Sequence, residues 1–152
     1  MSAQDFSAAN DWPGYFGAVL GKPPRDTLLA ALAAFEQEGT GRGFAVDLAA
    51  GEGRDTLPLL ERGWRVLATD AESAAFAYLW PRVPAAAQDR LTTTVARFED
   101  TVFPTCDLVN ASFALPFCEP LHLPALWGRI VAAIRPGGRF AAGTCGSWRD
   151  SW

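Results

Sequence analysis

The feature that most constrains the fold is a short apolar run that leads into a glycine-rich turn. Residues 44–49 are apolar apart from Asp47, and Gly51-Glu-Gly53 follows them. A helical pattern begins directly after this turn, at about Arg54. A buried strand, a tight Gly-x-Gly turn and a helix, in this order, are typical of the first unit of a doubly wound α/β sheet, whose ligands bind beside that turn.

The rest of the chain alternates between strand and helix patterns. Because strands that alternate with helices form right-handed βαβ units, the pattern predicts an α/β fold with a doubly wound, Rossmann-like, mostly parallel sheet. Strands are predicted at residues 44–49, 64–69, 91–96, 107–112 and 139–144, and helices from residue 26, at 54–62, at 72–80 and around 126–134, where Pro136-Gly137-Gly138 ends the last helix.

The chain divides into two parts by composition. Residues 1–25 are rich in aromatic residues, glycine and proline and are interpreted as an N-terminal arm or lid. Residues 26–152 carry the alternating pattern and are interpreted as one domain. Within the first part, Trp12, Tyr15 and Phe16 either cover a ligand or pack against the domain, and the sequence leaves both interpretations open.

An acidic residue stands where a nucleoside ligand needs one. Asp70 closes the second predicted strand, nineteen residues after Gly51. A carboxylate at this place in a doubly wound sheet accepts hydrogen bonds from ribose hydroxyls. An isolated Gly-x-Gly turn followed by a solvent-exposed acid would be only structural, but the strand, the turn, the helix and the spaced acid together favour a nucleoside site.

Two residues beside the turn favour S-adenosylmethionine over a dinucleotide. A dinucleotide site usually has Gly-x-Gly-x-x-Gly, and Thr56 occupies the third glycine position. Asp47 would place a negative charge near a bound pyrophosphate, whereas the same charge suits an amino-acid group that carries an ammonium.

Two segments carry a family resemblance. Val-Asp-Leu-Ala-Ala-Gly-Glu-Gly-Arg-Asp-Thr at 46–56 resembles the first motif of class I S-adenosylmethionine-dependent methyltransferases, and its Glu-Gly-Arg is similar to small bacterial members such as the tellurite-resistance type. Ala49 stands where the family commonly has glycine. Ile-Arg-Pro-Gly-Gly-Arg-Phe at 134–140 is similar to the motif that leads into the family's fifth strand. The resemblance implies the strand order 3-2-1-4-5, S-adenosylmethionine as cofactor and S-adenosylhomocysteine as product.

The resemblance also implies which residues bind the cofactor. They lie in the first motif and at the ends of the second, third and fourth strands, where adenine, ribose and methionine are bound in the family. The expected set is Asp47, Ala49, Gly51, Gly53, Arg54, Asp70, Ala71, Phe98, Glu99, Asn110, Ala111 and Ser112. The reaction that follows is methyl transfer to a small-molecule acceptor. Three alternatives remain: a nicotinamide-dependent oxidoreductase, a non-catalytic cofactor-binding module, and an enzyme of the same fold that does not methylate.

His122 is the one candidate for a general base, because it is the only histidine. A nucleophilic pair with Cys118 is disfavoured, because Pro120 and Pro124 flank His122 and interrupt regular helix. The cysteines contain no CxxC pair, which argues against a structural zinc site, and no metal is expected.

Charge and hydropathy limit which binding partners and which cellular setting are expected. The net charge is −4, Lys22 is the only lysine, and no basic run is present, so nucleic acid is not an expected partner. The sequence has neither a signal-peptide pattern nor a run of roughly 20 apolar residues that would cross a membrane, and the cytoplasm is the expected setting.

The end of the sequence raises one further expectation. The family sheet has seven strands, of which the last two form an antiparallel hairpin, whereas this sequence ends just after its fifth predicted strand. That strand is apolar except for Arg139 and would lie at an edge. Because apolar edges pair with other strands, we expect either a chain that is incomplete at its C-terminus or a homodimer formed through this edge.

Overall fold

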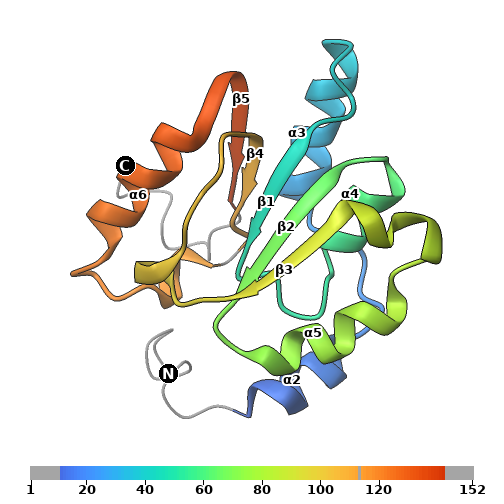
Figure 1. Ribbon diagram of the computed structural model, residues 1–152, viewed down its shortest axis with the longest axis vertical. Coiled ribbons are helices and arrows are strands. Elements are labelled where there is room, and N and C mark those ends of the chain that lie inside the picture. Colours follow the sequence, from blue (N-terminus) through green and yellow to red (C-terminus); the bar gives the residue numbers. More distant parts are fainter. Residues whose placement is uncertain (1–10, 113, 143–152) are drawn as a thin grey trace.

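The computed structural model describes residues 11–112 and 114–142 and contains one five-stranded parallel sheet (Figure 1). Its strands lie in the order β3-β2-β1-β4-β5, and each pair of neighbours is parallel. The strands are β1 (Phe44–Leu48), β2 (Arg65–Asp70), β3 (Leu91–Val95), β4 (Cys106–Asn110) and β5 (Ile134–Ala141). The predicted fold class and strand order are confirmed.

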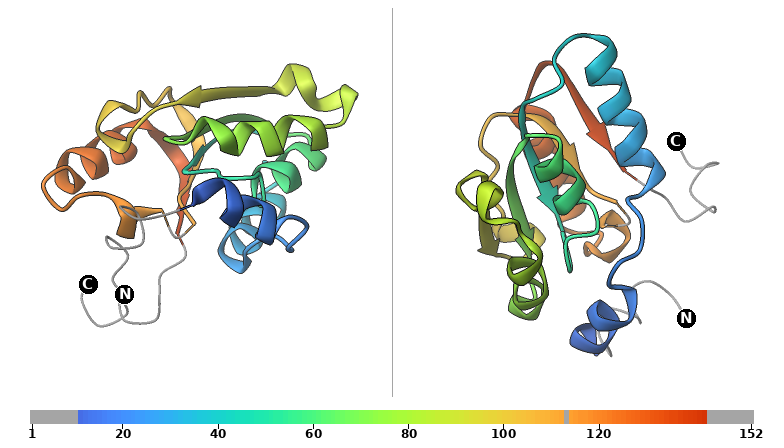
Figure 2. Two further views of the ribbon diagram at one scale, coloured as in Figure 1. Left: turned by 90° about the horizontal axis from the view of Figure 1, so that it is seen from below. Right: turned by 90° about the vertical axis from the view of Figure 1, so that its right-hand side faces the viewer.

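Helices cover both faces of the sheet (Figure 2). The α-helices are α2 (Trp12–Val19), α3 (Asp26–Gln37), α4 (Thr56–Glu61), α5 (Ser73–Leu79) and α6 (Leu123–Ala133), and the 3-10 turns are η1 (Trp80–Arg82), η2 (Ala85–Arg90), η3 (Phe98–Asp100) and η4 (Leu115–Phe117). One buried apolar cluster joins α3, α4 and α5 to the sheet, and a second joins α6 to the opposite face. None of the helices described is long and apolar enough to cross a membrane.

Helix α2 lies in the segment that the sequence presented as an arm. Its start has two ordinary helix signals, because the Asp11 side chain accepts a hydrogen bond from the Gly14 amide at 3.0 Å and Pro13 occupies the first turn. The helix packs beside α5, where a Cβ at Gly17 would lie 3.3 Å from the Tyr78 hydroxyl. Figures 1 and 2 show the two helices side by side. The contact places α2 near the ends of the strands.

The fifth strand begins earlier than predicted. Helix α6 ends at Ala133 and β5 starts at once, so the expected break at Pro136-Gly137-Gly138 falls inside the strand. Its pairing with β4 is irregular here, since Cys106 faces Ile134 while Leu108 faces Arg139. An edge strand tolerates a proline and a bulge that a central strand would not. Residues 143 and 144 of the predicted strand lie outside the described residues.

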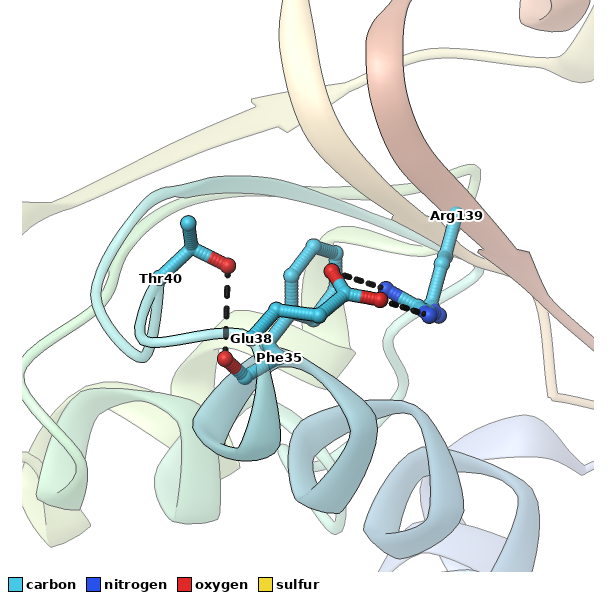
Figure 3. Close-up of polar contacts among 4 residues, drawn as sticks. All are labelled: Phe35, Glu38, Thr40 and Arg139. Carbon is cyan, nitrogen blue, oxygen red and sulfur yellow. Dashed lines mark hydrogen bonds and ion pairs between the residues drawn. The ribbon is translucent and has the colours of Figure 1, made fainter.

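Arg139 of β5 contacts Glu38 at the C-terminal end of α3 (Figure 3). Its guanidinium donates two hydrogen bonds to the Glu38 carboxylate, one of them at 3.0 Å, and lies 5.0 Å from the centre of the Phe35 ring. Strand β5 carries two charged residues, and both are paired within the chain: Arg139 with Glu38, and Arg135 with Asp107. Strand β5 lies at an edge of the sheet, and a homodimer through that edge remains a prediction.

Candidate functional site

A cavity of about 380 Å³ opens at the carboxyl ends of the strands. Its walls come from the turn after β1, the ends of β2 and β3, the segment after β4, and helix α2. The strand order reverses beside β1, and the carboxyl ends next to such a switch point form the ligand crevice of doubly wound sheets. Nine of the predicted residues line it: Asp47, Ala49, Gly51, Arg54, Asp70, Ala71, Phe98, Glu99 and Ser112.

Asp70 is held against the glycine turn. One carboxylate oxygen accepts a hydrogen bond from the Gly51 amide at 2.9 Å, and the other accepts one from the Glu72 amide at 2.9 Å. Burial raises the pKa of Asp70, while the bonds from these amides oppose that rise. Because a carboxylate has about four acceptor positions, the two oxygens can still accept hydroxyl protons from a ligand.

The turn itself departs from glycine at one strained position. Ala49 has φ 54°, in the left-handed region that costs an L-residue about 1–2 kcal/mol. At the position where the family commonly has glycine, the alanine therefore adopts an unfavourable backbone conformation. Gly51 has φ 58°, and a Cβ there would lie 3.4 Å from the Phe16 ring, so this glycine lets helix α2 approach the turn.

Gly53 and Thr56 serve the packing of the turn. A Cβ at Gly53 would lie 2.4 Å from Leu79, so the glycine allows α5 to pack against the turn, and Gly53 does not line the cavity. The Thr56 hydroxyl donates to the Asp47 carboxylate at 2.6 Å. The third glycine position of a dinucleotide motif is thus occupied by a side chain that holds an acid in place.

Beneath the turn lies a buried polar cluster. The Asn110 amide donates to Asp47 at 3.0 Å and to Asp55 at 3.0 Å, so a single amide group bridges the two carboxylates. A second oxygen of Asp55 accepts from the Arg25 amide at 3.0 Å. Burial and, to a smaller extent, the nearby Asp55 charge raise the pKa of Asp47 to about 7, against the opposing effect of the hydrogen bonds from Thr56 and Asn110.

Segments that follow β2, β3 and β4 complete the cavity lining. Ala71 follows β2, and Phe98 and Glu99 follow β3. Ser112 also lines the cavity, and its hydroxyl donates to the Asn110 side chain at 3.2 Å. Ala111 is fully buried, does not line the cavity and donates its amide to the Ala141 carbonyl at 2.8 Å, and its contact with the cofactor stays a prediction.

Sequence reasoning missed several lining residues. Asp55 lines the cavity although it was not a candidate, and Glu52 and Thr69 line it as well. The signal for Asp55 was its place between Gly53 and the start of the helix, where a side chain can turn back toward the strand. The additional lining residues are Leu48, Ala50, Glu52, Asp55, Thr69, Glu72, Ala96, Arg97, Ala114, Phe117 and Glu119.

Aromatic residues of α2 close one side of the cavity. Trp12, Tyr15 and Phe16 all line it. The Trp12 ring lies 6.0 Å from Phe16 in a stacked arrangement and 5.6 Å from Phe117 of η4 in an edge arrangement. These residues therefore both pack together and face the cavity. Arg25, which precedes helix α3, lines the cavity too.

His122 lies outside the cavity lining. It precedes helix α6, and its Nε2 is 3.7 Å from the carboxylate of Glu119, which does line the cavity. Cys118 is buried, and its thiol contacts the Glu119 carbonyl at 3.5 Å. Burial raises the pKa of this thiol, which does not favour a thiolate nucleophile.

Comparison with known proteins gives a family and a fold. Residues 45–138 match the sequence family described as "Methyltransferase domain". No functionally curated protein is significantly similar in sequence. The glycopeptide N-methyltransferase MtfA has the same fold, with a TM-score of 0.63 and 22% identity over 89% of this chain and 61% of MtfA.

Two bacterial enzymes are somewhat closer in sequence. The 1,6-didemethyltoxoflavin-N1-methyltransferase of Burkholderia thailandensis, solved with its substrate and S-adenosylhomocysteine, has a TM-score of 0.61 and 27% identity over 77% of this chain and 51% of that enzyme. An S-adenosylmethionine-dependent methyltransferase of Mesorhizobium loti has a TM-score of 0.62 and 27% identity over 76% of this chain and 52% of that enzyme. The chain thus spans about half to three fifths of the length of the solved proteins it resembles.

Proposed function

This chain belongs to the methyltransferase domain family, and on that premise we propose that it binds S-adenosylmethionine and transfers its methyl group to a small-molecule acceptor. The observation that carries the proposal is the Asp70 carboxylate, fixed on the amides of Gly51 and Glu72 at the edge of the cavity. An acid held this way presents free acceptor positions to the two hydroxyls of a ribose.

The other lining residues fit the remaining parts of this cofactor. Ala71 and Phe98 offer apolar surface to a base, and Asp47 offers a negative charge to an amino group. When bound, the cofactor supplies a methyl group activated by a sulfonium. The chain's own residues then have to orient the cofactor, position the acceptor and exclude water, which together account for much of the rate gain in such transfers.

A small acceptor is supported by the shape and charge of the site. Trp12, Tyr15 and Phe16 from α2 limit the space above the glycine turn, so the acceptor has to enter a partly closed cavity. Structural neighbours include methyltransferases named for a glycopeptide and for a small heterocycle. The net charge of −4 argues against nucleic acid as the acceptor.

Calorimetry tests the cofactor half of the proposal. S-adenosylhomocysteine should bind, and NAD should not bind comparably. Tight NAD binding with no response to S-adenosylhomocysteine would overturn it in favour of a nicotinamide-dependent enzyme.

Transfer is tested separately, with S-adenosylmethionine labelled in its methyl group and a fraction of small metabolites from cells. Label should appear in a small molecule, and only when intact protein is present. Cofactor binding with no labelled product from any fraction would instead favour a non-catalytic binding module.

A further inference from the structure

The cluster of Asp47, Asp55, Thr56 and Asn110 holds two acids and no cation. Asp47 and Asp55 are 2% and 5% exposed, and both line the cavity. Within the described part of the chain neither carboxylate takes part in an ion pair. Their hydrogen bonds come from neutral donors only, namely the Thr56 hydroxyl, the Asn110 amide and the Arg25 backbone amide.

Two carboxylates bridged by a single amide cannot both be ionised at low cost in a buried place. Like charges at short range favour keeping one proton on the pair, and desolvation acts in the same direction. Asp70 on β2 adds a third negative charge that faces Asp47, whereas α4 and β4 present only the neutral Thr56 and Asn110. For these reasons the pKa of Asp47 rises to about 7, so near neutral pH Asp47 retains its proton for much of the time.

We propose that Asp55 is a further ligand-binding residue, which acts with Asp47 as a paired receptor for the amino group of the cofactor, and that the entering ammonium displaces the proton held by this pair. The inference rests on the proposed function. It adds Asp55 as a second acidic residue that binds the amino group, and it adds the release of a proton when the cofactor binds. The exchange is balanced: the ammonium keeps its own protons, the shared carboxyl proton leaves to solvent, and both carboxylates end up ionised beside one positive charge.

This exchange gives the cavity a preference for nucleosides that carry an amino acid. A ligand without an amino group leaves the proton in place and gains nothing from the pair. A ligand with the amino group binds better as the pH rises, because the proton that it has to displace is then less often present. The affinity for S-adenosylhomocysteine should therefore be about tenfold lower at pH 6 than at pH 8, and should level off above pH 8.

Calorimetry in two buffers of different ionisation enthalpy measures the proton directly. The probes are S-adenosylhomocysteine and its analogue in which hydrogen replaces the amino group. At pH 6 the first should release close to one proton, and this number should approach zero above pH 8. The second should release none through this pair and should show no more than the pH dependence that the shared ribose contact with Asp70 contributes.

Replacing Asp55 separates a binding role from a structural one. Asp55→Asn keeps the side-chain size and removes the neighbouring charge, so Asp47 should ionise at lower pH and proton release at pH 6 should fall sharply. Affinity for S-adenosylhomocysteine at pH 8 should drop about tenfold, as expected for one charge-assisted contact, while affinity for the analogue should not change. Asp89→Asn, which removes an exposed charge outside the cavity, is the matched control and should change neither.

The outcomes are separable from the fate of the proposed function. Binding of S-adenosylhomocysteine without proton release, or with the same pH dependence as the analogue, would refute the paired receptor and leave cofactor binding intact. An equal loss of affinity for both ligands in Asp55→Asn would assign Asp55 to the structure of the site. Failure of the unaltered protein to bind S-adenosylhomocysteine at all would overturn both proposals. The comparison of the two ligands on the unaltered protein does not depend on any variant folding.

Discussion

Two aspartates on neighbouring parallel strands are placed in opposite ways. Asp107, near the start of β4, accepts a hydrogen bond from the Phe44 amide at 2.9 Å and pairs with Arg135 at 3.1 Å. Asp47, near the end of β1, is almost fully buried and accepts only from the neutral Thr56 and Asn110. The acid at the start of β4 is thus paired with an arginine, whereas among the described residues the acid at the end of β1 has no cationic partner.

The difference separates residues that serve the fold from residues that serve a ligand. An acid with a cation and an amide partner helps to fix the start of a strand. A buried acid without a cation lowers the stability of the free protein, and such groups persist mainly where a ligand supplies the missing charge. The buried acid without a cationic partner thus lies at the carboxyl end of the sheet, where a ligand would bind. Four variants test this contrast between the two ends.

The largest effect is expected at Asp70. Asp70→Ala removes a charge-assisted acceptor for the ribose, worth about 1.5–3 kcal/mol, so the affinity for S-adenosylhomocysteine should fall about tenfold to a hundredfold. Calorimetry measures it, and Asp107→Ala at the opposite end of the sheet is the control whose affinity should not change. An unaltered dissociation constant in folded Asp70→Ala would mean that this carboxylate does not hold the ribose.

The next effect concerns the stability cost of Asp47. In the folded protein Asp47 keeps its proton up to a pKa of about 7, whereas the unfolded chain releases it near the ordinary aspartate pKa of 3.8. Between pH 4 and pH 7 the native state therefore binds more protons than the unfolded state. As a result, the contribution of Asp47 to the free energy of unfolding declines as the pH rises from about 4 to 7, and it is constant above pH 7. Asp47→Asn should remove this decline and stabilise the free protein by about 1–3 kcal/mol at pH 8.

Urea unfolding of both proteins at several pH values measures the difference. It should be small near pH 4 and reach its maximum above pH 7. A variant that is less stable than the unaltered protein at pH 8 would show that the Asp47 charge is compensated, and the contrast with Asp107 would fail.

The sheet and the position of Asp70 could be predicted from sequence because both follow from local patterns. Strand and helix periodicity determines the order of elements, and the spacing from Gly51 to Asp70 reflects one βαβ unit. Helix α2 carried its own signals in Asp11 and Pro13, but the sequence analysis assigned residues 1–25 only to an arm or lid and predicted no helix there. The contact of α2 with α5, which lies far along the chain, does not follow from local patterns.

The buried cluster could not be predicted for a different reason. Asn110 lies 63 residues after Asp47 and 55 residues after Asp55, and only the pairing of β1 with β4 brings these side chains together. The sequence analysis therefore placed Asn110 among the residues expected to bind the cofactor. In the structure Asn110 is fully buried, and its amide bridges Asp47 and Asp55. The position of His122 outside the cavity likewise depends on where α6 begins, which the two flanking prolines left open.

A smaller effect is expected from the strained turn at the site. Ala49 has φ 54°, and glycine would relieve a cost of about 1–2 kcal/mol while adding about 0.5–1 kcal/mol of unfolded-state entropy. Ala49→Gly should therefore stabilise the protein by about 0.5–1 kcal/mol, measured by thermal unfolding. Ala50→Gly is the matched control, since Ala50 has no positive φ and its replacement should destabilise by a similar amount. Equal destabilisation by both would mean that Ala49 is not strained.

The smallest effect is expected at Asp107, and its dependence on salt distinguishes the two ends of the sheet. Asp107→Asn keeps an acceptor for the Phe44 amide and removes only the charge that faces Arg135, whose side chain is 48% exposed. A pair this exposed contributes about 0.2–1 kcal/mol and is screened by salt, so the variant should be slightly less stable at low ionic strength and nearly equal to the unaltered protein in 1 M salt. The gain from Asp47→Asn should persist in the same salt, because ions do not screen a fully buried carboxylate effectively. If the two differences disappeared together as salt was added, Asp47 would be as accessible to ions as Asp107, and the ligand end of the sheet would not be the dry, uncompensated site that its geometry indicates.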